Sequence, residues 1–363
     1  VGSDGLIKTA AAGEARFDHN SNGDSLGLLI EASSTNKFPS SLFSSGWSGQ
    51  GASITSTTEL APDGTNTAVI ITGSTGPGTK ALYVSSNQNG TGKNTFSFYA
   101  KATLPGTGQR TWINYFAGSA TNSVSPYIDL DTGLQNGSAG ATTSGDGTWG
   151  AYYHGNGWWR IWATLTPTGV HNFKWSAGCM AGESILIWGA QLESFDFATS
   201  YIPTSGSTVT RAADVASMTA SPYLYGTFVA EYKHIVPRTV QRRHIFAVGN
   251  ANGYHTFECK SQYDSNSDSN FVHIGMPNIA SLASAFTETS GFNTAAVVRI
   301  VGDYAVCVNG GSVATSTNTG DQTDNSVITF KYGRYGADSS GYISRFAYYN
   351  TRLTDSQLQE LTS

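Results

Sequence analysis

The sequence is poor in charged residues and in long apolar runs. Charged residues make up 12% of the 363 positions, so the chain lacks the Lys, Glu and Arg that normally cover helix surfaces. No run approaches the roughly 18 consecutive apolar residues of a membrane-spanning helix. The net charge of -5 argues against the basic footprint that nucleic-acid binding needs. We therefore expect neither membrane insertion nor a nucleic-acid partner.

Cysteine is also scarce. The three copies are too few for a disulfide framework or for a zinc site of the CxxC type. We expect Cys179, Cys259 and Cys307 to be reduced and buried. Cys259 and Cys307 fall in the same predicted domain, so their spacing leaves a disulfide between them open as an alternative.

Glycine, in contrast, is abundant, with 42 copies, and it accompanies short segments in which apolar and polar residues alternate. Segment 94–102, NTFSFYAKA, places Phe96, Phe98 and Ala100 on one face. A period of two predicts a β-strand with one face in the core. Such segments recur with turn signals about every 8 to 12 residues, the pattern of a β-sandwich.

The tryptophans mark a domain boundary. All eight lie between Trp47 and Trp188, and the stretch PTSGSTVT that follows has the composition of a connector. A chain of this length exceeds what one core usually serves. We predict an all-β protein of two antiparallel β-sandwich (jelly-roll) domains with an extended N-terminal arm. The predicted boundaries are 1–27 for the arm, 28–205 for the first sandwich, 206–219 for the linker and 220–363 for the second sandwich.

Local signals add three expectations. The arm lacks apolar periodicity, so we expect it to become ordered on another subunit or on the virion. Segment 298–311, VRIVGDYAVCVNGG, predicts a hairpin with Gly302 and Asp303 at its tip. Near the end of the chain, Thr354 and Gln357 have the spacing of a capping box for a short helix, which Leu358 and Leu361 would dock onto the sandwich.

Several segments together resemble a recurrent module of bacteriophage virion proteins. They are LGLLIEASSTNKF at 26–38, APDGTNTA at 61–68, FSFYAKA at 96–102, NGWWRIWATLT at 156–166 and IWGAQLESFDFATSYIPTSGSTVTRAAD at 187–214. Trp159 stands where such modules often carry Tyr. The resemblance implies a fold like a carbohydrate-binding jelly roll, assembly in the host cytoplasm as a homotrimer, and a place on the virion surface as a tail-fibre, head-fibre or decoration protein.

Residues 220–363 resemble a concanavalin A-like, laminin-G-type sandwich, chiefly through GYISRFAYYNTRLTDSQLQELT at 341–362. That superfamily contains lectins, glycosidases, lyases and structural modules, so the fold does not give the function. The resemblance to the virion module also implies a role for segment 189–214. It would be the last strand of the first sandwich and its exit toward the next module, a structural seam rather than a catalytic site.

Carboxylates offer little support for a glycosidase, which needs two of them across a cleft. Lectin-like enzymes often display Glu-x-Asp-x-x-Glu on one strand, and this string does not occur. Glu231 is better interpreted as a strand residue, and Asp129 with Asp131 as a turn pair. We therefore predict a protein that is not an enzyme, with a polysaccharide-degrading depolymerase or lyase that uses the second sandwich as the alternative.

A lyase would combine a Tyr, a His and a charge-neutralising Arg on one face. Such residues lie on neighbouring predicted strands of the second domain, but histidines spread over a β-rich surface also meet by chance. The lyase candidates are Tyr232, Arg243, His244, Tyr254 and His255.

One polar segment is a candidate for calcium binding. Asp264, Asn266 and Asp268 occupy the first, third and fifth positions of a calcium loop, but the following Gly and the distal Glu are missing. The EF-hand interpretation fails, which leaves a looser calcium site or a plain solvated loop. We expect no cofactor.

Arginines cluster in an otherwise charge-poor chain. Arg238, Arg242 and Arg243, next to His244, could hold an acidic glycan or an acidic partner by charge-assisted hydrogen bonds. A solvated hairpin is the alternative.

Aromatic residues supply the main candidates for glycan binding, because sugar-binding sandwiches stack pyranose rings on exposed Trp and Tyr. Strand parity predicts one face, opposite the core, that holds Tyr99, Lys101, Trp158, Arg160 and Trp162. Second-line candidates are Trp112, Tyr152 and Tyr153. The alternative is that Trp158 and Trp162 pack against the second sandwich, the arm or a neighbouring subunit.

We therefore expect a non-catalytic virion protein that takes part in assembly with other virion proteins and adheres weakly to host-surface polysaccharide. Several shallow sites, multiplied by a trimer, would supply the avidity. A purely structural capsid decoration or cement protein without a ligand is a further alternative.

Overall fold

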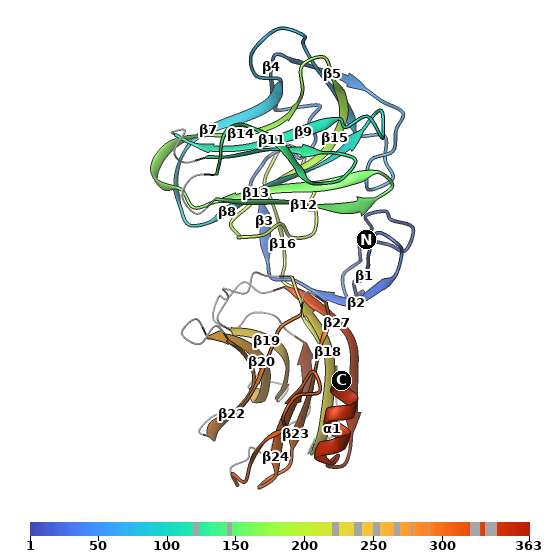
Figure 1. Cartoon of the computed structure of the whole chain (residues 1–363), viewed down its shortest axis with the longest axis vertical. Helices are drawn as coiled ribbons and strands as arrows, with labels where there is room; N and C mark the ends of the chain where they lie inside the picture. The colour runs from blue at the N-terminus through green and yellow to red at the C-terminus, as the bar shows by residue number, and fades with distance from the viewer. Residues whose placement is uncertain are drawn as a thin grey trace. The chain divides into compact units, whose positions relative to one another are not determined.

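The computed structural model describes the chain apart from residues 119–122, 144–146, 220–224, 236–241, 250–254, 265–268, 277–278, 290, 320–326 and 331–339. In the described part, nearly all regular structure is antiparallel β-sheet, and one helix lies near the end of the chain (Figure 1). The predicted all-β class is confirmed.

The chain divides into two compact units, and successive segments of its N-terminal part belong alternately to one unit and the other. Unit 1 contains Val1–Thr9, His19–Asp24 and Ser33–Arg211. Unit 2 contains Ala10–Asp18, Ser25–Ala32 and Ala212–Ser363.

Unit 1 contains two six-stranded antiparallel sheets, named here after one residue of each. The Trp112 sheet has the order β11 (Gln135–Thr143), β10 (Ser123–Asp129), β9 (Arg110–Ala117), β14 (Thr168–Cys179), β7 (Ala81–Thr91) and β4 (Ser48–Gln50). The Trp162 sheet has the order β12 (Thr148–Gly155), β13 (Trp158–Leu165), β8 (Asn94–Ala102), β15 (Ser184–Glu193), β6 (Val69–Gly73) and β5 (Ala52–Ser56). A short pair joins β3 (Ser34–Asn36) to β16 (Val209–Arg211).

The core of unit 1 lies between these sheets and follows the alternation seen in the sequence. Phe96 and Phe98 of β8 are fully buried in one cluster with Ile161 of β13 and with Ile113 and Tyr115 of β9. Because this cluster draws on both sheets, they pack as a sandwich. Burying each such side chain contributes about 1.5–3 kcal/mol.

Unit 2 also pairs two sheets. The seven-stranded sheet has the order β1 (Phe17–His19), β2 (Ser25–Ile30), β27 (Gly341–Tyr349), β18 (Gly226–His234), β23 (Asn293–Arg299), β24 (Tyr304–Val308) and β25 (Ala314–Ser316). The six-stranded sheet has the order β17 (Ala216–Thr219), β26 (Val327–Phe330), β19 (Arg242–Gly249), β20 (His255–Asp264), β21 (Ser269–Met276) and β22 (Ile279–Phe286). Phe228, Phe246 and Phe257 are central to the core between them.

The N-terminal segment differs from the predicted arm, because part of it completes the sheet of unit 2. Leu28 and Ile30 pair with β27, and Ile30 is buried in the core. The boundary drawn at residue 28 therefore cuts through a strand of unit 2, and residues 17–19 and 25–27 are ordered within this chain. This pairing joins residues that are far apart in the sequence, which local composition does not reveal.

Strands β1 and β2 are neighbours in the sheet and form the N-terminal hairpin, which an ion cluster in unit 2 holds in place. The Arg16 guanidinium donates to the carboxylate of Asp214, at 3.1 Å from Nε to Oδ1, and to Glu31 Oε2 at 2.9 Å. The backbone N–H of Glu31 donates to Asp214 Oδ2 at 2.8 Å. Arg16 thus ties the segment before β1 to the residues that follow β2 and β16.

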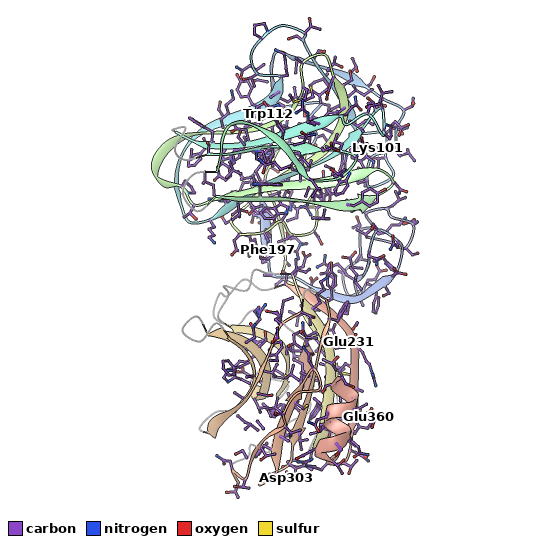
Figure 2. The ribbon with its side chains drawn as sticks, viewed as in Figure 1. Lys101, Trp112, Phe197, Glu231, Asp303 and Glu360 are labelled. Carbon is purple, nitrogen blue, oxygen red and sulfur yellow. The ribbon has the colours of Figure 1, made fainter. Side chains whose placement is uncertain are left out.

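Two local predictions in unit 2 are confirmed. β23 and β24 form the predicted hairpin, with Asp303 at its tip (Figure 2) and Gly302 at a φ of 78°. Helix α1 (Asp355–Thr362) has the predicted capping box between Thr354 and Gln357, and Leu358 is fully buried against the seven-stranded sheet. Among the described residues, no helix has the length and apolarity to span a membrane.

All three cysteines are buried and free, as expected. Cys259 points into the core between the sheets of unit 2, whereas Cys307 lies in the cluster beneath α1, on the other face of the seven-stranded sheet. The alternative of a Cys259 to Cys307 disulfide is therefore wrong, because the two thiols are separated by a sheet.

Candidate functional site

The predicted polar and aromatic face exists on the Trp162 sheet. In the register between β13 and β8, Trp158 pairs with Lys101, Arg160 with Tyr99, and Trp162 with Ser97. The intervening residues, such as Phe98 and Ile161, fill the core. The strand parity read from the sequence is therefore correct.

Most of this face is covered, however, so the expectation that it is open is wrong for Trp158 and Tyr99. Each is 2% exposed and belongs to a second apolar cluster, against which Ile7 and Tyr201 also pack. The Trp158 Nε1 donates to the carbonyl oxygen of Leu60 at 3.2 Å. Segments of unit 1 that are distant in sequence fold back over the sheet, including Ile7 of the predicted arm.

Arg160 is a structural cation rather than an open ligand contact. Its guanidinium, 2% exposed, donates to the carbonyl oxygen of Thr199 at 2.6 Å, to Ser97 Oγ at 3.2 Å and to the Tyr152 hydroxyl at 3.3 Å. Burial acts to lower the pKa of Arg160, but Tyr152, Tyr99 and Glu193 outweigh it and the pKa lies above its usual value. The guanidinium therefore stays charged inside unit 1.

The seam at residues 189–214 holds the counterpart of this cation. Glu193 is fully buried and accepts from the Thr199 N–H at 3.0 Å and from the Ser34 hydroxyl at 2.6 Å. Thr199 therefore joins the carboxylate to Arg160. The bonds of Glu193 and Thr199 fix the end of β15 and the segment that follows it.

Two other candidates, Lys101 and Trp112, do not add to an open binding face. Lys101 forms an ion pair with Glu59, with 2.9 Å between Nζ and Oε2. Trp112 lies on the other sheet (Figure 2), where it is 7% exposed and packs over Gly178. The sequence therefore grouped residues that the fold places on two different sheets.

Trp162 remains partly exposed and lies over a glycine of the edge strand. Its register partner is Gly150 of β12. A Cβ built on Gly150 would fall 2.7 Å from Cζ2, 2.8 Å from Cε2 and 2.9 Å from Nε1 of the indole. The ring therefore rests on bare backbone, and its Nε1 bonds to no group in the described part of the chain.

Tyr152 flanks this indole on the same face of β12. It pairs with Arg160, one diagonal step from Trp162, and such neighbours lie about 7–8 Å apart. Tyr152 is 44% exposed, and Arg160 donates to its hydroxyl from below. We call Trp162 and Tyr152 the aromatic platform. Gly150 was not among the predicted site residues, although a glycine in a strand is a known sign of close approach by another group.

Tyr153 is as exposed as Tyr152, at 43%, but it points to the opposite face. Its ring lies edge-on to that of Trp159, with 5.2 Å between the ring centroids, and its hydroxyl accepts from the Gly157 N–H at 3.0 Å. Of the two second-line tyrosines, only Tyr152 shares a face with Trp162.

The arginine cluster of unit 2 does not form an open anion site at Arg243. Its side chain is 1% exposed and makes two bonds to Glu288, at 2.8 and 2.9 Å, so its charge is already paired. Arg243 points between the sheets, which the sequence did not reveal. Arg238 and the side chain of Arg242 lie outside the described residues.

The lyase candidates whose side chains the structure describes lie next to residues that were not predicted. Tyr232 is fully buried in the core, with its ring 5.1 Å from that of His234. His244 Nε2 lies 3.8 Å from Glu258 Oε2. Tyr254 and the side chain of His255 lie outside the described residues.

The remaining acidic candidates show no site. Asp129 accepts from the N–H groups of Asp131 and Thr132, so the predicted turn pair is confirmed. Glu231 lies on β18, as expected of a strand residue (Figure 2). Asn266, Asp268 and the side chain of Asp264 lie outside the described residues, and the described residues hold no group of His, Cys, Asp or Glu that could bind a metal.

Comparison with known proteins gives structural similarities only. No protein-family model and no curated protein matches the chain. Among solved structures, it is similar to a heptameric SAP-like pentraxin from Limulus polyphemus (TM-score 0.31, 17% identity, 38% of this chain and 69% of that chain). It is also similar to a tetrameric galectin from the ball sponge Cinachyrella sp. (TM-score 0.29, 12% identity, 38% and 100%) and to domains LG4-5 of the mouse laminin alpha1 chain (TM-score 0.26, 9% identity, 75% and 89%). The all-β antiparallel class follows from the strand pairings themselves, and these similarities assign no functional residue.

Proposed function

We propose that this chain is a non-catalytic protein of a bacteriophage virion surface, on a fibre or on the head, that adheres weakly to host glycans. The location is supported by the sequence resemblance of residues 5–215. Glycan binding is supported by one observation above all, the indole of Trp162 resting on Gly150 beside the exposed ring of Tyr152.

The chemistry of the aromatic platform suits a sugar ring. The C–H face of a pyranose is apolar and stacks on an aromatic ring, while its hydroxyls need polar partners nearby. The indole Nε1 and the Tyr152 hydroxyl are the polar groups at the platform. Arg160 fixes the Tyr152 ring from below, which reduces the side-chain freedom that binding would otherwise remove.

Two aromatic rings at a sheet edge make a shallow site. Such a site binds weakly on its own, so useful adhesion depends on several copies acting together. We propose that a homotrimer, assembled with other virion proteins, supplies those copies. The same shallow site offers no paired carboxylates for hydrolysis.

The test compares Trp162→Ala, Tyr152→Ala and Tyr153→Ala for retention on immobilised host polysaccharide. Loss of a stacking partner is worth about 1.4 kcal/mol, so the first two variants should bind about tenfold more weakly. Tyr153→Ala is the matched control, because it removes an equally exposed tyrosine from the opposite face. Circular dichroism and light scattering would establish that fold and oligomer are unchanged. Equal retention of the wild-type protein and all three variants would contradict the proposal.

A purely structural decoration protein is the second candidate. The burial of Trp158, Tyr99 and Arg160 favours it, because most of the face predicted to bind ligand instead stabilises unit 1. It predicts that the Trp162→Ala variant alters particle assembly or stability while host binding stays the same. The enzyme alternative predicts new reducing ends, or the absorbance of unsaturated uronates, when the protein is incubated with host polysaccharide.

A further inference from the structure

The outer face of the Trp112 sheet carries a second set of polar and aromatic side chains. Ser176 of β14 pairs with Tyr83 of β7 on one side and with Asn114 of β9 on the other. Lys174 lies two positions along β14 from Ser176, on the same face. The alternating neighbours of these residues, including Trp175, fill the core, so the four side chains point away from it.

The Lys174 ammonium contacts an aromatic ring and an amide. Its Nζ lies 4.1 Å from the centroid of the Tyr83 ring and donates to Gln50 Oε1 at 2.7 Å. No carboxylate of the described residues forms an ion pair with it, although acidic residues outnumber basic ones in the chain. Burial lowers the pKa of Lys174, which reflects an ammonium that is partly desolvated and not neutralised.

Ser176 presents an unused hydroxyl next to that cation. The residue is fully buried, and its Oγ has no hydrogen-bond partner among the described residues. A buried hydroxyl in that state is unfavourable, because it has lost its hydrogen bonds to water without gaining others. A ligand oxygen that draws the flexible Lys174 ammonium away from Gln50 could also accept the hydrogen bond of Ser176 and recover this free energy.

Asn114 adds a donor on the other side of Ser176. Its Oδ1 accepts from the Ser125 hydroxyl at 2.9 Å, which fixes the amide and leaves its NH2 group to donate outward. The exposed amide of Gln50 supplies a further donor and acceptor at the opposite edge. The face therefore combines one unpaired cation with neutral groups that match sugar hydroxyls.

From this arrangement we infer that the outer face of the Trp112 sheet binds an acidic saccharide, whose uronate carboxylate pairs with the Lys174 ammonium and accepts from Ser176. Hydroxyls of the same sugar would bond to Asn114 and Gln50. A charge-assisted bond of this kind favours the acidic sugar over its neutral counterpart. The inference adds a site to the proposed glycan binding, but it involves a different sheet and does not depend on the aromatic platform.

The experiment is calorimetric titration of the full chain with hexagalacturonate and with the same hexasaccharide after reduction of its carboxyl groups. The acidic ligand should bind at least tenfold more tightly at low salt, and added salt should reduce that difference. Lys174→Met should abolish the difference, whereas Lys174→Arg should retain most of it. Ser176→Ala should weaken binding about threefold without lowering the melting temperature, because it removes an unpaired hydroxyl.

The Trp162→Ala variant separates this inference from the proposed function. It should leave the preference for hexagalacturonate intact, even if retention on neutral glycans is lost. Equal affinity for the two ligands, no binding of hexagalacturonate, or an unchanged preference in Lys174→Met would each overturn the inference. Loss of the preference in Trp162→Ala would do the same, since it would place the acidic ligand on the aromatic platform. All eight tryptophans lie in unit 1, so their fluorescence reports whether this unit is folded in every variant.

Discussion

The indole of Trp162 occupies the position that a side chain on Gly150 would need. The two residues are register partners on β13 and β12, and a Cβ on Gly150 would come within 2.7 Å of the ring. The glycine is therefore as much a part of the aromatic platform as the tryptophan. Its φ is not in the left-handed region, so only the ring, and not the backbone, requires glycine there.

Gly150→Ala should consequently disturb the platform while retaining both aromatic residues. The new methyl group would push the indole away from β12, and retention on host glycan should fall toward that of Trp162→Ala. Unit 1 should lose no more than about 1–3 kcal/mol, the range for overpacking, since β12 is an edge strand. Affinity chromatography and fluorescence unfolding would measure both effects. Wild-type retention in Gly150→Ala would show that the position of the indole does not matter.

Arg160→Met should destabilise unit 1 by about 3–5 kcal/mol, because it leaves the buried Glu193 without the cation that balances it. It also leaves the carbonyl oxygen of Thr199 without its donor. Tryptophan fluorescence in guanidinium chloride would give the free energy of unfolding. Arg110→Met is the control, because that guanidinium bonds only at the exposed surface, and it should cost less than about 1 kcal/mol. A loss below about 1 kcal/mol in Arg160→Met would mean that the network contributes little.

The stability of unit 1 should fall as the pH rises above about 9. Burial raises the pKa of the Cys179 thiol and of the Tyr201 hydroxyl, each to about 12, from ordinary values of 9.0 and 10.0. Between these limits the unfolded chain loses protons that the folded chain keeps, so the stabilising contribution is complete below about pH 9 and declines above it. Each group contributes a slope of up to about 1.4 kcal/mol per pH unit.

Fluorescence unfolding at several pH values would measure this slope, and Cys179→Ala should make it shallower. A free energy of unfolding that stays constant from pH 8 to pH 11 would contradict the assignment of Cys179 and Tyr201 as buried neutral groups.

Arg16→Ala should loosen the N-terminal hairpin of unit 2. Glu31, 3% exposed on its side chain, and Asp214 would both lose their bonds to the Arg16 guanidinium. We expect a loss of about 2 kcal/mol and faster amide hydrogen exchange in β2. Lys8→Ala is the control, since the ion pair of Lys8 with Asp4 is exposed and worth little. Unchanged exchange in β2 would show that strand pairing alone holds the hairpin.

Features that depend on nearby residues could be predicted from the sequence. The alternation of Phe96 and Phe98 with polar residues gave the correct face of β8, and Thr354 with Gln357 gave the correct start of α1. Both signals act over a few residues, through side-chain parity and through a capping box.

Features that depend on distant segments could not be predicted. Ile30 belongs to unit 2 because β2 pairs with β27. The buried Arg243 guanidinium is balanced by Glu288, which lies 45 residues further along the chain. No short-range pattern distinguishes a buried paired arginine from an exposed one.

For this protein, then, the sequence by itself determined the all-β class, the two faces of strands β8 and β13 and the capped final helix, because these follow from the local period of the chain. Only the tertiary structure decided which predicted residues stay accessible. Trp158 and Trp162 have the same parity on β13, yet Trp158 bonds to Leu60, 98 residues away, and is covered, while Trp162 rests on Gly150 and stays partly open. Exposure depends on what folds over a face, and that is set by contacts between segments far apart in the sequence.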